Sequence, residues 1–388
     1  MQKLISNRAS SVARSGIRVM YDLALGVEGL VHLEIGEPDF STPQHIIDAA
    51  KRALDEGHTH YTPNAGYKDL REQIARKVLE DNGIEARPES DIIVTAGAMQ
   101  AISSAILVTI DPGDEVLIPD PGYESFSRQV KFADGVPVPV QVKEEEEFRL
   151  NPKGVEKAIT KKTKMIVVNT PSNPTGSVMT QRDLEGIAEL AKQHDLLVLS
   201  DEIYEKILYD GAKHHSIASF PDMADRTITV FAFSKTYAMT GWRVGYAVGP
   251  KPIVKEMTKI QEFYVTCAPS ICQRAALAAL EGSQDCVREM LHEFSRRRDF
   301  MYNELTQLKR LSCVRPKGAF YLFPNIAGIG LRSEETAKIL LEKGKVVTAP
   351  GRAFGKHGDN FLRMSLGTSM QNLKSAAERI RTMPLFKE

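Results

Sequence analysis

The stretch FAFSKTYAMTGWRVGYAVG, from Phe231 to Gly249, places Lys235 between two apolar runs, in a segment that also holds the chain's single tryptophan. The runs on either side are typical of buried strands. A lysine at the point where a strand leaves the core is most often simply solvated, with its stem along apolar surface. A chemical role for Lys235 therefore depends on what the rest of the sequence brings to the same place.

Short apolar runs rich in Val and Ile alternate with helical patterns from Asp91 to Pro250. They are DIIVTAG, DEVLIPD, VPVPVQV, TKMIVVNT, LLVLSDE, TITVFAFS and VGYAVGP. Runs that are apolar nearly throughout indicate strands buried on both faces. Between two of them, TQRDLEGIAELAKQHD has one apolar stripe, with Thr180 as a helix cap and Asp183 near the positive helix end. We therefore predict an α/β fold in which helices sandwich a mostly parallel sheet of seven strands.

The flanking sequence predicts further helices and a smaller second domain. Upstream, STPQHIIDAAKRALDEG has a cap, an early proline and a terminal glycine, and KDLREQIARKVLEDNG predicts another helix. After Pro250 a long charged helical segment precedes the short strands GAFYLFP, VVTAPG and FLRMSL. We expect a large domain over residues 31–281 and a small α+β domain built from both termini, residues 1–30 and 282–388.

Composition excludes several classes of partner. The 388 residues include 50 lysines and arginines and 50 aspartates and glutamates, so no net charge favours nucleic acid or an anionic membrane. Apolar runs stay short of the roughly 18 residues that a spanning helix needs, and the amino terminus MQKLISNRASSVARSG lacks the apolar core of a signal peptide. We therefore expect no membrane or nucleic-acid partner and a cytoplasmic location.

Cysteine and histidine spacing gives no sign of a metal site. The four cysteines lack paired short spacings, which favours buried thiols over a zinc site or disulfides. His214 and His215 are adjacent and isolated in the sequence from further ligands. We therefore predict no bound metal.

Polar residues follow the predicted strands where each strand ends, and the ends of parallel strands meet at one edge of a sheet. Gly97 follows the first run and opens a helix, which directs the amides of Ala98 and Met99 toward an anion. Ser234 and Arg243 add donors to this predicted phosphate pocket. The other residues at strand ends are Asn173, Asp201, Tyr204 and Lys235.

An amine, an acid and a phosphate pocket at neighbouring strand ends meet the needs of pyridoxal phosphate. Asp201 would keep the pyridine nitrogen protonated, while Asn173 and Tyr204 hydrogen-bond the phenolic oxygen. Arg243 would help to lower the pKa of Lys235. Each of these residues alone also fits a plain structural role, such as a solvated strand end or a turn, and only their combination indicates a cofactor site.

The chain resembles the class I aminotransferases of fold type I, in particular their archaeal and bacterial aspartate and aromatic amino acid branch. The resemblance covers nearly the full length. It rests on GEPDF from Gly36, HYTPNAGYKDLRE from His60, PSNPTG from Pro171, SDEIYE from Ser200, SKTYAMTGWRVGY from Ser234, KGAFYLFP from Lys317 and FLRMSL from Phe361.

The resemblance implies a role for each matching residue. Lys235 would bind pyridoxal 5′-phosphate covalently and, with Asp201 and Tyr204, form the catalytic set. Tyr123 would stack on the ring. The substrate α-carboxylate would be bound by Arg363, with Asn173 and the backbone of Gly36 assisting. Tyr61 would reach across a homodimer to the partner's cofactor phosphate.

Two departures from the family pattern are informative: Ala232 removes one side-chain donor to the cofactor phosphate, and Met99 bears on the substrate. Ala232 stands where relatives often carry serine, and Met99 stands where one aspartate-specific branch carries a lysine for the distal carboxylate. We therefore expect a homodimeric aminotransferase that moves the amino group of an L-amino acid, aspartate or aromatic, to 2-oxoglutarate in two half-reactions. Ile17, Arg18 and Asn64 are candidates to line the outer pocket. The alternatives are a carbon–sulfur β-lyase and a nonenzymatic regulator on the same fold.

Overall fold

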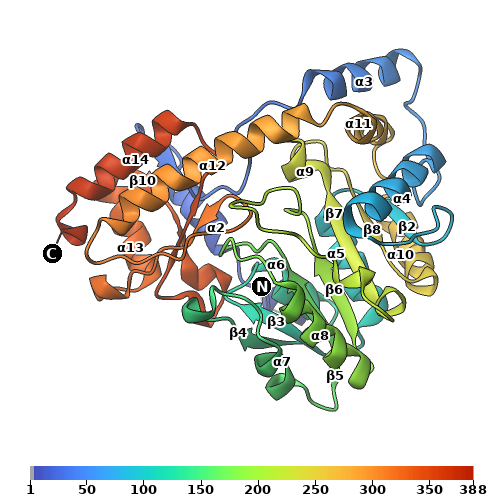
Figure 1. Cartoon of the computed structure of the whole chain (residues 1–388), viewed down its shortest axis with the longest axis horizontal. Coiled ribbons are helices and arrows are strands. Elements are labelled where there is room, and N and C mark those ends of the chain that lie inside the picture. Colours follow the sequence, from blue (N-terminus) through green and yellow to red (C-terminus); the bar gives the residue numbers. More distant parts are fainter. Residues whose placement is uncertain (1–3, 388) are drawn as a thin grey trace.

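The computed structural model describes residues 4–387, and a seven-stranded sheet forms its centre (Figure 1). The strand order is β2-β8-β7-β6-β5-β3-β4, and only β8 runs against its neighbours. The strands are β2 (Ile92–Thr95), β3 (Glu115–Asp120), β4 (Val136–Gln141), β5 (Thr163–Asn169), β6 (Leu197–Asp201), β7 (Thr227–Ala232) and β8 (Gly245–Val248). Each lies in one of the seven apolar runs, which confirms the predicted sheet.

Helices cover both faces of the sheet because its central strands are apolar on both sides. One face packs on α5 (Ala98–Thr109), α6 (Ser125–Phe132) and α10 (Lys251–Tyr264). The opposite face packs on α7 (Pro152–Ala158), α8 (Gln181–Gln193), α4 (Lys68–Asn82) and α11 (Ser270–Glu281), with α3 (Gln44–Asp55) beyond α11. This is the predicted sandwich of helices around a mostly parallel sheet.

The expectation that every strand is buried on both faces is wrong for β4. This strand, VPVPVQ, lies at the sheet edge next to β3, and of its six residues only Val140 is buried. Pro137 and Pro139 lack an N–H, so they are tolerated at an edge, where one side of the strand needs no ladder partner. Apolar composition alone did not distinguish this edge strand from the buried strands.

Two predicted helix starts have different outcomes. Thr180 caps α8 and forms a reciprocal capping box with Asp183, as expected. The cap expected for α3 is wrong, because the residue before the helix is Pro43, which makes no capping hydrogen bond. The hydroxyl of Thr42 instead donates to the carbonyl of Ala238, 2.7 Å away.

The two ends of the chain share one hydrophobic core beside the large sheet (Figure 1). Here β1 (Val31–His32) pairs in parallel with β10 (Val346–Val347), and β12 (Leu362–Ser365) lies between β11 (Ala349–Pro350) and β9 (Tyr321–Leu322). The helices of this region are α2 (Gly16–Ala24), α12 (Asp285–Thr306), α13 (Ser333–Ile339) and α14 (Met370–Thr382). The short helix α1 (Asn7–Ser10) lies outside this core, where Arg8 pairs with Asp134.

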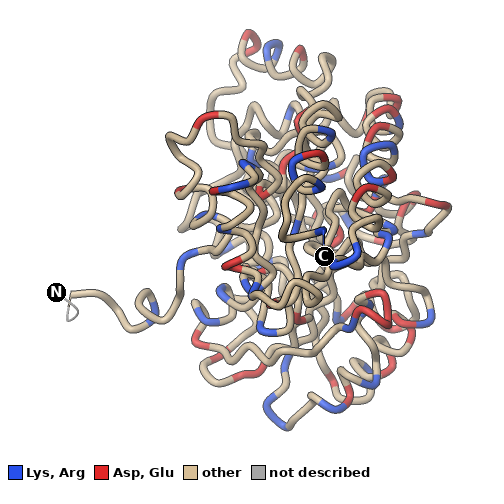
Figure 2. The backbone as a smooth tube through the Cα atoms, turned by 90° about the vertical axis from the view of Figure 1, so that its left-hand side faces the viewer, with Lys and Arg blue, Asp and Glu red and all other residues tan. Residues whose placement is uncertain are grey.

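The surface carries both signs of charge, interspersed along the backbone (Figure 2). Among the described residues, none of the helices combines the length and apolar character that crossing a bilayer requires. All four cysteines are free thiols, but they are partly exposed rather than buried as expected. The expectation failed because cysteine composition carries no positional information.

Candidate active site

A cavity of about 520 Å³ opens at the carboxyl ends of the parallel strands, between the large sheet and the terminal region. Its walls come from α2, from the segment around Gly36, from the ends of β5, β6 and β7, and from β9 and β12. Most of the residues singled out in the sequence line it: Gly36, Ala98, Met99, Tyr123, Asn173, Asp201, Tyr204, Ser234, Lys235, Arg243 and Arg363. Parallel strands bring together side chains that are far apart in the sequence.

Lys235 lies on α9 (Phe233–Thr236), which begins directly after β7. Its Nζ donates a hydrogen bond to the carbonyl of Gly36, 2.6 Å away, so the ammonium is held by a neutral acceptor. Burial lowers the pKa of Lys235 to about 8, and the cations Arg363 and Arg243 act in the same direction, while Glu37 and Asp201 oppose them. A cation was expected to lower this pKa, but the larger cause is loss of water around the amine.

Asp201 ends β6 and is 1% exposed. Burial raises its pKa to about 7; the amide of Ile203, which donates to Oδ1 over 3.3 Å, lowers the pKa, while the neighbouring charge of Glu202 raises it. A carboxylate in this position therefore lacks a cationic partner strong enough to keep its pKa in the usual range. It is suited to a protonated nitrogen that a ligand would bring.

A candidate anion pocket lies at the start of α5. Gly97 precedes this helix with a φ of +84°, and no side chain caps the helix amides. A Cβ on Gly97 would meet Nη2 of Arg243 at 2.6 Å, so only glycine lets the guanidinium come this close to the backbone. With Ala98 and Ser234 on the same cavity wall, amides, a hydroxyl and a cation converge.

Arg363 on β12 is 2% exposed and faces the cavity. Its Nη1 donates to Oδ1 of Asn173 over 3.2 Å, and Nη2 donates to the carbonyl of Glu34. Its Nε is buried and has no hydrogen-bond partner in residues 4–387. A buried guanidinium without a carboxylate partner is costly unless an anion binds there.

Three other predicted positions have distinct outcomes. Tyr123 lines the cavity beside Met99, and its hydroxyl lies 3.7 Å from the Met99 sulfur. Tyr61 lies outside the cavity and is 85% exposed. Of the candidates for the outer pocket, Ile17 and Arg18 line the cavity, whereas the Asn64 side chain donates to the carbonyl of Thr266 outside it.

Sequence reasoning missed two residues that hold the predicted ones in place. The hydroxyl of Tyr321 lies 2.7 Å from that of Tyr204. A Cβ on Gly36 would collide with the Tyr321 hydroxyl. Asn169, the last residue of β5, accepts from the amide of Asn173 and donates to the carbonyl of Asp201, over 3.0 Å and 3.2 Å. Both belonged to quoted segments, and for Asn169 the rule that polar residues at strand ends gather was the available signal.

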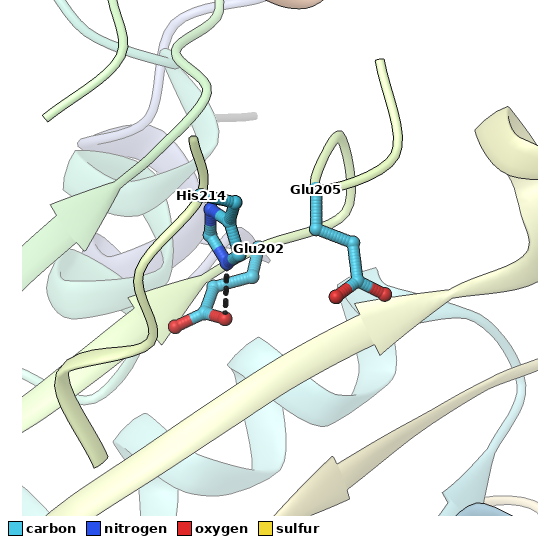
Figure 3. Close-up of side chains that lie close together, drawn as sticks. All are labelled: Glu202, Glu205 and His214. Carbon is cyan, nitrogen blue, oxygen red and sulfur yellow. Dashed lines mark hydrogen bonds and ion pairs between the residues drawn. The ribbon is translucent and has the colours of Figure 1, made fainter. Parts of the chain in front are cut away.

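His214 is not isolated from other ligand-type side chains, as its sequence position had indicated. Glu202 and Glu205 lie beside it, and the potential ligand atoms of the three residues are within 4.8 Å of one another (Figure 3). The chain folds so that a loop after β6 returns to the end of that strand. Residues that are separated in the sequence are therefore neighbours in the fold, which the spacing of histidines did not indicate.

The fold and the cavity together define an α/β enzyme whose site combines a buried amine, a carboxyl group and two places for anions. The sequence model of the family "Aminotransferase class I and II" matches residues 28–380. The chain is 46% identical to "Aromatic-amino-acid aminotransferase 2" of Thermococcus litoralis and 47% identical to "Aspartate aminotransferase" of Pyrococcus abyssi, over 97% of each chain in both comparisons.

A solved structure of aspartate aminotransferase from Thermus thermophilus with maleate superposes with a TM-score of 0.92 at 40% identity. The match covers 97% of this chain and 98% of that one. The chain therefore belongs to the class I and II aminotransferases. This assignment confirms the resemblance drawn from the sequence motifs.

Proposed function

We propose that this aminotransferase uses pyridoxal 5′-phosphate, bound to Lys235, to move the amino group of aspartate or an aromatic amino acid to 2-oxoglutarate. The observation that carries the proposal is the convergence of Lys235, Asp201 and Arg363 on one cavity. Each supplies a different chemical function: an amine, a carboxyl group and a carboxylate receptor.

The residues present fit this cofactor. The amides at the start of α5, Ser234 and Arg243 would hold its phosphate, and Tyr123 would lie on its ring. Asp201 would pair with the ring nitrogen, which supplies the positive charge that this buried carboxyl lacks. When bound, the cofactor supplies an electron-withdrawing ring that makes the Cα–H bond of the substrate acidic.

Lys235 is placed to move the proton. With a pKa of about 8, its amine is neutral far more often near pH 7.5 than an ordinary lysine. Once released from the cofactor by the incoming amino acid, Nζ can accept the Cα proton and later return it. Tyr204 and Asn173 would orient the ring oxygen, since Tyr321 and Asn169 fix their positions.

Arg363 would bind the substrate α-carboxylate. Its guanidinium lies over the ring of Tyr321, 4.7 Å from the centroid, and its hydrogen bonds to Asn173 and to the Glu34 carbonyl fix its plane. The free Nε and the remaining Nη protons give it the fork that matches a carboxylate. A substrate held there presents its Cα toward Lys235.

The outer wall of the cavity fits both acidic and aromatic side chains. Met99 and Ile17 are apolar, and Arg18 on α2 is the cation that this part of the wall supplies. A distal carboxylate buried without a partner would be unfavourable, and Arg18 relieves that cost. The maleate in the Thermus thermophilus enzyme is likewise a dicarboxylate, which is consistent with this reading.

We also propose a homodimer in which Tyr61 reaches the partner's cofactor phosphate. Tyr61 is 85% exposed, and Phe263 and Tyr264 are 81% and 60% exposed at the end of α10. Large apolar groups exposed together favour an interface. The division into a large domain, residues 31–281, and a small domain stays a prediction, which the hydrophobic core shared by both termini supports. The cytoplasmic location also stays a prediction.

A panel of twenty amino donors tests the proposal, with conversion of the bound aldehyde form to the amine form followed by absorbance. We expect acidic and aromatic donors to react and 2-oxoglutarate to reverse the change. Arg18→Ala should raise KM for aspartate and 2-oxoglutarate about tenfold, with aromatic donors little affected. The control is Arg14→Ala, because Arg14 pairs with Asp22 and lies outside the cavity.

Two results would contradict this assignment. Turnover confined to alanine or branched aliphatic donors would refute the reading of the outer wall. Release of pyruvate and ammonia from a cysteine conjugate, without need of a keto acid, would instead indicate the β-lyase alternative.

A further inference from the structure

Next to Asp201, and outside the lining of the cavity, is a buried polar network that the proposed chemistry does not use. Asp201 lines the cavity, whereas the next residue, Glu202, does not line it and is fully buried. The Glu202 carboxylate accepts a hydrogen bond from Nε2 of His214 over 2.7 Å (Figure 3). It also accepts hydrogen bonds from the hydroxyl of Ser200, over 2.7 Å, and from that of Ser216. The end of β6 is therefore held by groups outside the lining of the cavity.

The network extends to α4 through Glu205. Lys77 of α4 forms an ion pair with Glu205, and Asn82 donates to Glu205 over 2.6 Å and to Ser216 over 3.0 Å. Glu205 belongs to the same turn as Tyr204. One set of buried hydrogen bonds thus joins α4, the loop at His214 and the turn that carries active-site residues.

The network brings two basic groups, His214 and Lys77, against two carboxyl groups, Glu202 and Glu205. Burial would lower the pKa of His214, but the charge and hydrogen bond of Glu202, together with the charge of Glu205, raise it above its ordinary value. Burial acts to raise the pKa of Glu205, but the charges of Lys77 and His214 and the hydrogen bonds of Lys77 and Asn82 outweigh it. The pKa of Glu205 is therefore below its ordinary value, and this carboxyl stays ionised. The His214 imidazole and the Lys77 ammonium already bind oxygens of the two carboxyl groups, which favours these pairs over a bound metal ion.

We propose that His214 and Glu202 are positioning residues for Asp201: the protonated imidazole neutralises Glu202, and this pair fixes both the place of the Asp201 carboxyl and the charge that acts on it. The inference rests on the proposed function, because it concerns the residue that would face the cofactor's ring nitrogen. Neither His214 nor Glu202 lines the cavity, so both act through Asp201.

The electrostatic part of the proposal follows because Glu202 is the residue directly after Asp201. The charge of Glu202 is among the causes that raise the pKa of Asp201. A neutral residue at position 214 would leave Glu202 unbalanced in a water-poor region, where charges interact strongly. The extra negative potential would stabilise protons on the bound cofactor and on the nitrogen that joins it to Lys235.

Other titratable groups face the network and stay constant in the tests below. Asp81 lies 3.8 Å from the Lys77 ammonium and 2.7 Å from that of Lys206. Burial raises the pKa values of Tyr237 and Tyr246, and the Glu205 charge raises them further, so both phenols stay neutral. His215 is the natural control, since burial and the His214 charge lower its pKa and it is only partly buried.

The first test follows the visible absorption of the bound cofactor as the pH is changed. It compares wild type with H214Q, with the double variant E202Q/H214Q and with the control H215Q. Glutamine retains a hydrogen-bond donor but removes the positive charge. We expect H214Q to raise the midpoint by roughly half to one pH unit. The double variant removes both charges and should return the midpoint to that of wild type, as should H215Q.

A purely structural role would not give this pattern. An unchanged midpoint in H214Q, or a double variant shifted as far as H214Q, would overturn the proposal. Circular dichroism melting of each variant establishes that the compared proteins are folded. A wild-type protein that binds no pyridoxal phosphate would instead refute the proposed function.

The second test does not depend on the cofactor. Nuclear magnetic resonance of the imidazole carbons and nitrogens in cofactor-free protein should show His214 titrating above the ordinary histidine range, while His215 titrates below it. E202Q should lower the His214 pKa by more than one unit, because burial then acts without its partner charge. A His214 that titrates at or below the ordinary histidine value in wild type would overturn the ion pair and with it the inference.

Discussion

Single side chains in this active site owe their chemistry to where the fold buries them. Lys235 is an ordinary lysine in the sequence, but burial lowers its pKa to about 8, and the same effect raises the pKa of Asp201 to about 7. The two shifts bring an amine and a carboxyl toward the pH at which a proton can be exchanged. Arg243, the cause first expected from the sequence, is a smaller contributor.

Reduction with borohydride should attach the cofactor irreversibly to the peptide that contains Lys235. Lys235→Ala should abolish turnover, while the phosphate pocket still binds the cofactor, because binding and proton transfer use different groups. Peptide mass mapping identifies the labelled residue. Lys68→Ala is a suitable control, since Lys68 is exposed and lies outside the cavity. Labelling of another lysine would end the assignment.

Asp201 should make the cofactor-free protein less stable as the pH rises from about 4 to 7. The unfolded carboxyl loses its proton near 3.8, whereas the folded one keeps it until about 7, so the native state binds more protons across this window. Asp201→Asn has no titrating carboxyl at this position. Between pH 4 and pH 8 its free energy of unfolding should therefore rise relative to that of wild type by on the order of 2 to 4 kcal/mol. Urea unfolding at several pH values measures the free energy of unfolding of both proteins. If these free energies changed with pH in parallel, the account of Asp201 as a buried, protonated carboxyl would be contradicted.

At the scale of elements, the start of α5 shows how a helix becomes a binding site. The helix has no side-chain cap, and Gly97 turns the chain with a positive φ while leaving room for Arg243. The amides that a Ser or Asp cap would satisfy stay free for an anion. The capping box of α8, by contrast, serves only the stability of that helix.

Gly97→Ala should weaken pyridoxal phosphate binding at least tenfold, because the added Cβ meets the Arg243 guanidinium at 2.6 Å. The matched control is Gly113→Ala: Gly113 has a similar φ of +91° but open space around the added carbon. Both variants should also lose stability, on the order of 1 to 3 kcal/mol, because a side chain disfavours a positive φ. Fluorescence titration with the cofactor separates them, and equal affinities would show that the close approach of Arg243 is not needed for binding.

At the scale of the whole molecule, the active site joins regions from most of the chain. Strand β6 of the large sheet supplies Asp201, and α9, directly after β7, supplies Lys235. The region built by both termini supplies Arg363 and Arg18. Tyr61 is too exposed to serve the cavity of its own chain.

An inactive Tyr61→Ala protein mixed with an inactive Lys235→Ala protein should recover activity if Tyr61 acts across a dimer. Each mixed dimer then has one site with both residues intact, so up to about one quarter of wild-type activity should return after random exchange of subunits. Sedimentation and mass-tagged subunits establish that exchange occurred. No recovery after demonstrated exchange would place Tyr61 outside the partner's site.

The sequence was sufficient for the seven strands, because long-range packing agrees with local pattern where strands are buried on both faces. Asp201, Asn173, Lys235 and Arg363 were found because they follow strands or lie in specific motifs, and the geometry brings them to one cavity. Where local pattern and packing differ, the sequence misled: the edge strand β4 is apolar but exposed, and Thr42 contacts another loop rather than capping α3.

Only the tertiary structure decided which charges are buried and what stands beside them. His214 lies 12 residues after Glu202 in the chain, yet the fold closes that distance to a 2.7 Å hydrogen bond. The lowered pKa of Lys235, the free Nε of Arg363 and the network next to Asp201 likewise arise from burial and proximity. The sequence by itself determined the strands and the motif residues; desolvation and contact between distant residues are properties of the folded chain, so their consequences appear only there.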